Sequence, residues 1–261
     1  MKRKKLYFPL LLATVLFISW KVLPSEWLAE NHKIYTLYYQ SADSENKKEY
    51  VQLVDNALQS VHFFFNDGFN NKFGVYFHPN RQSLDSQWQS DFNTPGLKSD
   101  CWMVASGTSK KLDVISPRNW DKESCEHNYA DKIKVQELIT HELFHVFHSQ
   151  FITGSDFTKT DHIDWFVEGL ATYASGQCDS LRLAEVRSLI ANNQVPKSLY
   201  DFWKGKSRYG LSGSMVMFTD IKYGRKKLKM LLKFDKTADL LSSLNISEAA
   251  LLDEWKKYFE S

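Results

Sequence analysis

The chain has 261 residues, of which 33 are basic and 31 acidic, so its net charge is only +2. Hydrophobic residues make up 43% and aromatic residues 15%, which excludes a disordered chain and suffices for one large or two small domains. A charge this close to balance gives no support to nucleic-acid binding. We therefore expect no nucleic acid among the partners.

Residues 1–24 have the pattern of an export segment. The basic residues Lys2 to Lys5 precede an apolar run, Leu6–Trp20. The run is shorter than the roughly 20 residues of a membrane-spanning helix, but no good small-residue cleavage site follows it. We predict a signal anchor or a signal peptide, with a buried N-terminal helix as a third alternative. Both export interpretations place residues 25–261, predicted as a single domain, outside the cytoplasm, either membrane-anchored or secreted.

Residues 25–127 predict a mixed α/β part. A polar link leads to a first strand rich in β-branched and aromatic residues, and a helix with apolar residues on one face follows. The later stretch 81–100 has no clear period and is predicted as an irregular insertion. The predicted strands are 34–40, 73–77, 102–106 and 112–116, and the predicted helix is 49–65.

The last two strands predict a hairpin whose turn is longer than two residues, Gly107 to Lys111. Such an element could offer an edge strand to an extended peptide. An ordinary sheet member with both edges covered is the alternative.

The three cysteines have no CxxC spacing and do not predict a structural zinc site. Outside the cytoplasm a disulfide is possible. Cys101 with Cys125 is the preferred pair because both lie in the loop-rich stretch before the motif described below. The other pairings with Cys178, and three free thiols, stay open.

Residues 128–261 predict a mainly helical part, so the fold class is α+β with a small mixed sheet first. Its first helix begins near Asp131, and its apolar residues, Ile133 among them, cover most of its circumference. Asp164 is predicted to cap the second helix. The first predicted helix begins between 128 and 131 and ends near 150, and the others are 165–175, 180–192, 211–223, 225–234 and 247–259.

The motif His141-Glu142-Leu143-Phe144-His145 lies inside the first of these helices. Histidines four residues apart share a helix face, so both imidazoles can bind one ion. Glu142 lies about 100° around the helix, where it suits a base for a metal-activated water. Placing these polar groups in a helix that is apolar nearly all round is unfavourable unless something binds them.

The second helix predicts a third ligand. Glu168 lies one turn into Trp165–Ala171, and Gly169 allows close approach to the first helix. Two histidines and one glutamate leave the fourth zinc position for water, which is the catalytic arrangement. The sequence therefore predicts one Zn²⁺ per chain, with Glu142 as general base. The predicted zinc ligands are His141, His145 and Glu168.

The pairing of HELFHVF with WFVEGLATYAS resembles the gluzincin metallopeptidases, in particular the peptidase MA-like group. The resemblance implies a zincin-like helical half and a zinc-dependent metallopeptidase that hydrolyses peptide bonds of a peptide or protein substrate, with Glu142 as base. The spacing that metzincins require is missing. Two alternatives stay open: a non-hydrolytic zinc-binding protein for envelope binding or assembly, and a zinc amidase acting on a non-protein envelope substrate.

The groups around the motif are less defined. Gluzincins often stabilise the developing charge with a Tyr or His, and we predict Tyr209 for this role, with Tyr173 and His162 as competitors and a buried structural tyrosine as the alternative. We expect His148 beside the ligands or on the surface. Glu137 either orients His141 or is a solvated helix charge.

Two further residues complete these expectations. His78 is expected at a strand end or on the surface, not as a ligand, as is usual for a lone histidine. Thr172 stands where thermolysin-like enzymes have an aspartate, four residues after the glutamate ligand. With a threonine at this position, the group that hydrogen-bonds the second nitrogen of His141 is undefined.

Overall fold

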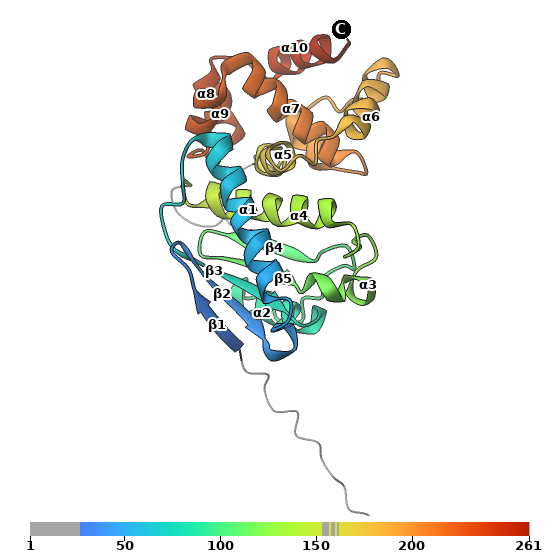
Figure 1. The fold of residues 1–261 in the computed structure, drawn as a ribbon. Helices are drawn as coiled ribbons and strands as arrows, with labels where there is room; N and C mark the ends of the chain where they lie inside the picture. Colours follow the sequence, from blue (N-terminus) through green and yellow to red (C-terminus); the bar gives the residue numbers. More distant parts are fainter. Residues whose placement is uncertain (1–26, 153–156, 158–159, 161, 261) are drawn as a thin grey trace, which may run out of the picture.

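The structure, a computed structural model, describes residues 27–152, 157, 160 and 162–260. The predicted export segment at residues 1–24 lies outside this part of the chain. Among the described residues no helix has the length and apolar character needed to cross a bilayer. The fold is α+β, as the sequence predicts: a small mixed sheet lies at one end and a mainly helical half at the other (Figure 1).

The sheet has five strands in the order β1-β2-β3-β5-β4. The three central strands run parallel, and β1 and β4 pair antiparallel at the two edges. The predicted hairpin is therefore real and its first strand is an edge strand. Its turn, however, is only the two residues Ser109 and Lys110, because Thr108 already pairs with Lys111. The strands are β1 Trp27–Asn31, β2 Tyr35–Gln40, β3 Phe73–His78, β4 Ala105–Thr108 and β5 Lys111–Ile115.

Burial alternates along the first part of two of the three central strands, β2 and β3. In β2, Tyr35 and Leu37 are buried, and in β3, Phe73 and Val75 are buried, while the residues between them are partly exposed. The predicted helix 49–65 is confirmed as α1 (Lys47–Phe65), which packs against the later helix α4 and contributes to the same core as the sheet. The chain thus forms a layer of helices over a twisted sheet.

Two elements of this half differ from the sequence prediction. The expected polar link contains the edge strand β1. This strand pairs with β2 alone and has few buried positions, so its sequence lacks the apolar residues that predict a strand. The expected irregular insertion begins with helix α2 (Arg81–Asp91). Few residues of the sequence indicate this helix. Asn80 caps it by accepting a hydrogen bond from the Ser83 backbone N–H, and Leu84 and Trp88, one turn apart, are its buried residues.

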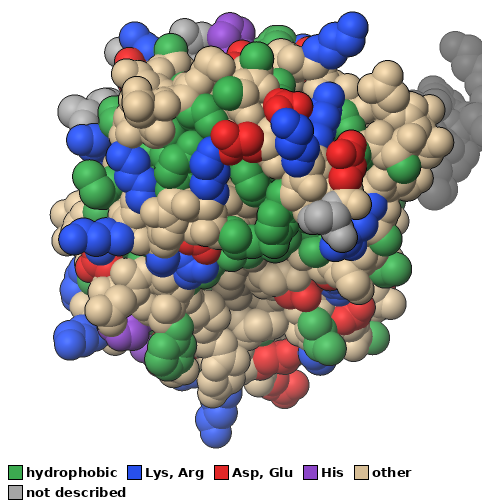
Figure 2. All heavy atoms as spheres, turned by 90° about the horizontal axis from the view of Figure 1, so that it is seen from above, with side chains coloured by type: hydrophobic (Ala, Val, Ile, Leu, Met, Phe, Trp, Pro, Cys, Tyr) green, Lys and Arg blue, Asp and Glu red, His purple; other side chains and the backbone are tan. Residues whose placement is uncertain are grey.

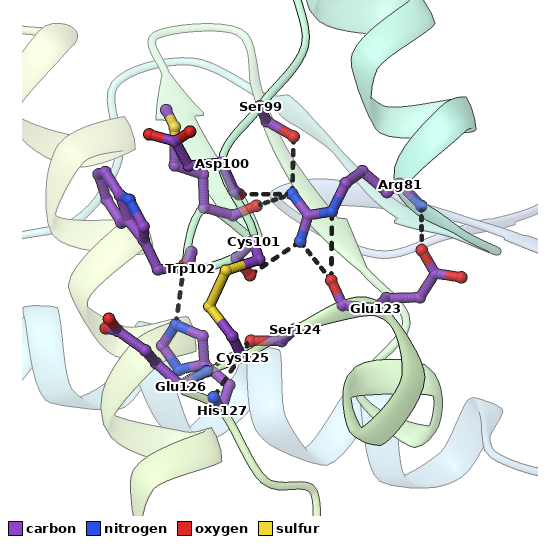
Figure 3. Close-up of a disulfide and its surroundings, with 11 residues drawn as sticks. Arg81, Ser99, Asp100, Cys101, Trp102, Glu123, Ser124, Cys125, Glu126 and His127 are labelled. Carbon is purple, nitrogen blue, oxygen red and sulfur yellow. Dashed lines mark hydrogen bonds between the residues drawn. A yellow bond between two sulfur atoms is a disulfide. The ribbon is translucent and has the colours of Figure 1, made fainter.

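The disulfide between Cys101 and Cys125 is present, with Cα atoms 5.4 Å apart, which confirms the preferred pairing. The third cysteine, Cys178, is free and partly buried. Figure 3 shows the Arg81 guanidinium against the same loop, where it donates to the carbonyl oxygens of Asp100 (2.8 Å) and Cys101 (3.0 Å). A covalent bond and a fan of hydrogen bonds therefore fix the segment that leads into β4.

Helix α4 (Lys132–Ser149) lies between the two hydrophobic cores of the protein. Phe144 and Phe147 belong to the core of the helical half, whereas Ile139 and Leu143 belong to the core against the sheet. The predicted central helix is confirmed. One position differs: Ile133, expected to be buried, is 71% exposed, whereas Val135 in the same turn is buried in the core against the sheet.

The helical half packs around α5 (Asp164–Ala174) and α7 (Arg208–Tyr223), whose contact is the most extensive between any two elements. A Cβ on Gly169 would lie 2.4 Å from the Ser212 carbonyl oxygen, so only glycine permits this approach. Ile163, not Asp164, occupies the cap position of α5. The remaining helices are α3 Trp120–Glu123, α6 Ser180–Ala191, α8 Arg225–Leu231, α9 Thr237–Leu244 and α10 Glu248–Glu260.

The surface seen from above the helical half mixes charges of both signs with hydrophobic side chains (Figure 2). This distribution agrees with the near-balanced charge of the chain.

Candidate metal centre

Two histidines on α4 face the same point. Asp131 caps the helix by accepting a hydrogen bond from the Lys134 backbone N–H at 3.1 Å, so the helix begins as the sequence predicts. One turn separates His141 from His145, and their Nε2 atoms lie 3.0 Å apart. Both rings are nearly buried and stand at 80° to each other. Their lone pairs can therefore point at one ion.

Helix α5 brings a carboxylate to the same place. The Glu168 Oε2 atom lies 3.4 Å from the Nε2 of His141 and 3.5 Å from that of His145. All three donor atoms lie within 4.8 Å of one another. The three predicted ligands thus come together and could hold a metal ion. No other cluster of this kind occurs within the described ranges.

The electrostatics of the cluster suit a cation. Burial by itself would raise the pKa of Glu168, but the neighbouring His145 and His141 hold that pKa far below its usual range. Burial would lower the pKa of His145, and the charges of Glu168 and Glu142 raise it instead. Glu168 and His145 are thus each stabilised in the charged form by their neighbours, and a bound cation would replace the proton of His145.

Glu142 lies beside the donors and contacts the edge strand. Burial raises its pKa, which His145 and His141 partly offset. The Gly107 backbone N–H donates a hydrogen bond to its carboxylate. A Cβ on Gly107 would lie 2.2 Å from the Glu142 backbone oxygen, so β4 can approach α4 this closely only because that residue is glycine.

Of the three candidates for the charge-stabilising group, only Tyr209 lies at the site. Its ring is 6.4 Å from that of His141, and it lines the cavity over the donors. Tyr173 donates a hydrogen bond to Asp220 at 2.9 Å and does not line this cavity. His162 is exposed and also lies outside the lining. The geometry therefore separates Tyr209 from its competitors.

His148 and Glu137, on the same helix as the two histidine ligands, take different positions. His148 is fully buried against the rings of Phe157 (5.1 Å) and Phe166 (5.7 Å), so a surface position is wrong. Burial lowers its pKa to about 3. Glu137 forms an ion pair with Lys134 at 2.9 Å, which confirms a helix charge and leaves it engaged away from His141.

The second nitrogen of His141 has no partner among the described residues. Its Nδ1 atom is buried without a hydrogen bond, and so is the hydroxyl of Thr172. The aspartate of thermolysin-like sites thus has no counterpart within the described ranges. His78, at the end of β3, is not on the surface: it is buried and bonded to Asp113 (2.9 Å) and Ser83 (3.0 Å), away from the centre.

A cavity of about 440 Å³ opens over the donors. One wall is the segment after Cys101 together with β4, and the opposite wall comes from α5, α6 and the start of α7. His127 donates from Nε2 to the Trp102 carbonyl oxygen at 3.0 Å and joins the two chain segments next to the disulfide (Figure 3). The hairpin that was predicted as a possible edge strand for a peptide thus lines the cavity, whereas Arg208 was not predicted, and its position directly before Tyr209 was the one available indication.

No protein-family model matches the chain, and no curated protein matches it either. The resemblance to gluzincins therefore stays a prediction carried by the motif residues.

Proposed function

We propose that the chain is a zinc metallopeptidase that acts on peptides or proteins outside the cytoplasm. The convergence of two imidazole nitrogens and one carboxylate oxygen, with a second carboxylate beside them, is the observation that carries the proposal. Tetrahedral zinc with bonds of about 2.0 to 2.2 Å requires donors roughly 3.3 to 3.6 Å apart. The two separations from Glu168, 3.4 and 3.5 Å, lie in that range, and the 3.0 Å between the two histidine nitrogens is slightly shorter than it.

The roles of the side chains follow from their positions. His141, His145 and Glu168 would hold the zinc, which supplies Lewis acidity that activates water at neutral pH. Glu142 accepts the proton of the attacking water, and its partly raised pKa suits a group that later returns the proton to the leaving amine. The Tyr209 hydroxyl donates to the oxygen on which negative charge develops.

The edge strand supports a peptide as the substrate. Val104 faces β5, because its carbonyl oxygen accepts from the Ile115 N–H at 2.8 Å. Backbone groups alternate along a strand, so those of Ala105 and Gly107 point away from β5. Gly107 is engaged with Glu142, and Ala105 is left to pair with an extended chain in the cavity.

The disulfide supports a location outside the cytoplasm, since such bonds persist in oxidising compartments. An export segment at residues 1–24 agrees with that location. Anchoring to the membrane or secretion would both follow from it.

The experiment is a comparison of zinc content and peptide hydrolysis in wild type, Glu142→Gln and Tyr209→Phe. Wild type should bind about one zinc per chain and cleave peptides. Glu142→Gln should keep zinc and lose activity by at least about 10²-fold, and Tyr209→Phe by about 10²-fold with unchanged zinc. The matched control is Tyr173→Phe, which should keep its activity.

A wild type without zinc, or a Glu142→Gln variant with unchanged turnover, would contradict the peptidase. Activity on cell-wall material with none on peptides would favour the amidase instead.

A further inference from the structure

Arg208 is a cation placed where its own helix disfavours one. It is the first residue of α7, and the N-terminal end of a helix carries the positive end of the dipole. The side chain is partly buried and lines the cavity beside Tyr209. Because the helix does not stabilise a positive charge in that position, groups in the cavity must do so.

Three aromatic rings from separate segments surround this guanidinium. Its Cζ atom lies 4.9 Å from the ring of Trp102, 5.2 Å from that of Trp203 and 5.2 Å from that of Tyr209. Trp203 and Tyr209 also contact each other edge to face at 4.8 Å. Stacking holds a guanidinium by its faces and leaves the N–H groups at its edge free to donate.

No carboxylate compensates the charge. Among the described residues, no carboxylate oxygen lies within the 4.0 Å of an ion pair with Arg208, and Tyr209 is its only hydrogen-bonding side chain. The inner acidic groups of the cavity are engaged elsewhere: Glu168 with the histidines and Glu142 with Gly107. Arg182, the other arginine of the lining, donates to the Gln177 carbonyl oxygen. Arg182 also lies 5.4 Å from the Tyr209 ring, but Arg208 has three rings around its guanidinium and is therefore the better-placed cation for a ligand.

We propose that Arg208 is a specificity residue that binds a carboxylate of the peptide substrate, an inference that rests on the peptidase function proposed above. Planar guanidinium and carboxylate groups match in a bidentate pair, and a partly dry aromatic surround strengthens it. Trp102 and Trp203 hold the guanidinium in place for this contact.

The position of Arg208 sets how far the carboxylate lies from the bond that is cut. The Tyr209 ring lies 6.4 Å from the ring of His141 and 5.2 Å from the Arg208 guanidinium. The cation and a metal ligand are therefore neighbours of the same ring. An extended peptide covers about 3.5 Å per residue, so the carboxylate belongs within the first few residues from the scissile bond.

A carboxylate at that distance has two sources. The free C-terminus of a peptide would make the chain remove short C-terminal fragments. An acidic side chain would make it cleave within a protein near Glu or Asp. The contact with Arg208 is the same in both cases, and the experiment separates them.

The experiment measures binding without turnover. Zinc-loaded Glu142→Gln protein is titrated calorimetrically with three pools of N-acetylated tetrapeptides that are otherwise random and neutral. The first pool has free C-termini, the second has C-terminal amides, and the third has C-terminal amides with one glutamate. One anionic pool should bind about 10-fold to 100-fold more tightly than the neutral pool, and the pool that does so identifies the source.

Adding Arg208→Gln should abolish this preference, and adding Arg208→Lys should keep part of it, since lysine retains the charge but not the planar pair. Arg187→Gln, on the exposed side of α6, is the matched control and should leave the preference intact. Unchanged zinc content and circular dichroism show that each variant is folded.

Equal affinity for the three pools, binding of none, or a preference that survives Arg208→Gln would overturn the proposal. Its failure differs from that of the peptidase: a chain that discriminates the pools while wild type cleaves none refutes hydrolysis and not the carboxylate site.

Discussion

Removal of the Cys101–Cys125 disulfide should destabilise the protein by an amount set by the loop that it closes. The two cysteines are 24 residues apart in sequence. Closing a loop of that length lowers the entropy of the unfolded chain, which corresponds to about 3.5 kcal/mol of stability at 25 °C. The double variant Cys101→Ser, Cys125→Ser should lose roughly this free energy of unfolding.

The folded structure around the disulfide should persist in the variant. The Arg81 guanidinium still donates to the carbonyl oxygens of Asp100, Cys101 and Met103, at 2.8, 3.0 and 2.8 Å. Most of the loss therefore lies in the unfolded state. Zinc content should stay the same, while the Michaelis constant rises because the wall that carries Trp102 is held less firmly.

The assay is urea unfolding followed by circular dichroism at fixed zinc concentration. Wild type with reductant should match the double variant, and Cys178→Ser, which removes only the free thiol, should match oxidised wild type. A loss below about 1 kcal/mol in the double variant would refute the argument from loop closure.

Two further predictions concern close packing and pH. Gly107→Ala should lower the free energy of unfolding by about 1 to 3 kcal/mol and also lower kcat/KM, because the new Cβ would meet the Glu142 backbone oxygen. Gly68→Ala, in open space, is the control. Equal effects of the two variants on unfolding and hydrolysis would contradict the prediction. His148 has a pKa lowered from 6.5 to about 3 by burial, so unfolding takes up a proton and wild type loses stability as pH falls from about 6.5 towards 3. In urea titrations, His148→Gln should reduce the slope of stability against pH by up to about 1.4 kcal/mol per pH unit. The exposed His62→Gln should leave the slope unchanged. An unchanged slope in His148→Gln would contradict the role of this buried histidine.

The sequence by itself determined the elements whose pattern is local. Apolar periodicity predicted α1 and α4, and a run rich in β-branched and aromatic residues predicted β2. The spacing of the two histidines determined that they share a face, because helix geometry fixes where residues four apart lie. A capped helix with an early glutamate predicted α5, and packing then brought Glu168 to the histidines.

Which distant residues meet depends on the packing of the whole fold. The edge strand β1 and the helix α2 have few apolar residues, and their partners in the sheet and core complete them. His148 is buried because two phenylalanine rings, one from α5 and one from the segment before it, close over it. Gly107 meets Glu142, and Trp102 meets Arg208, through packing between segments far apart in the chain. Local periodicity encodes each segment, whereas these contacts depend on how the segments pack together, which no single stretch of sequence records.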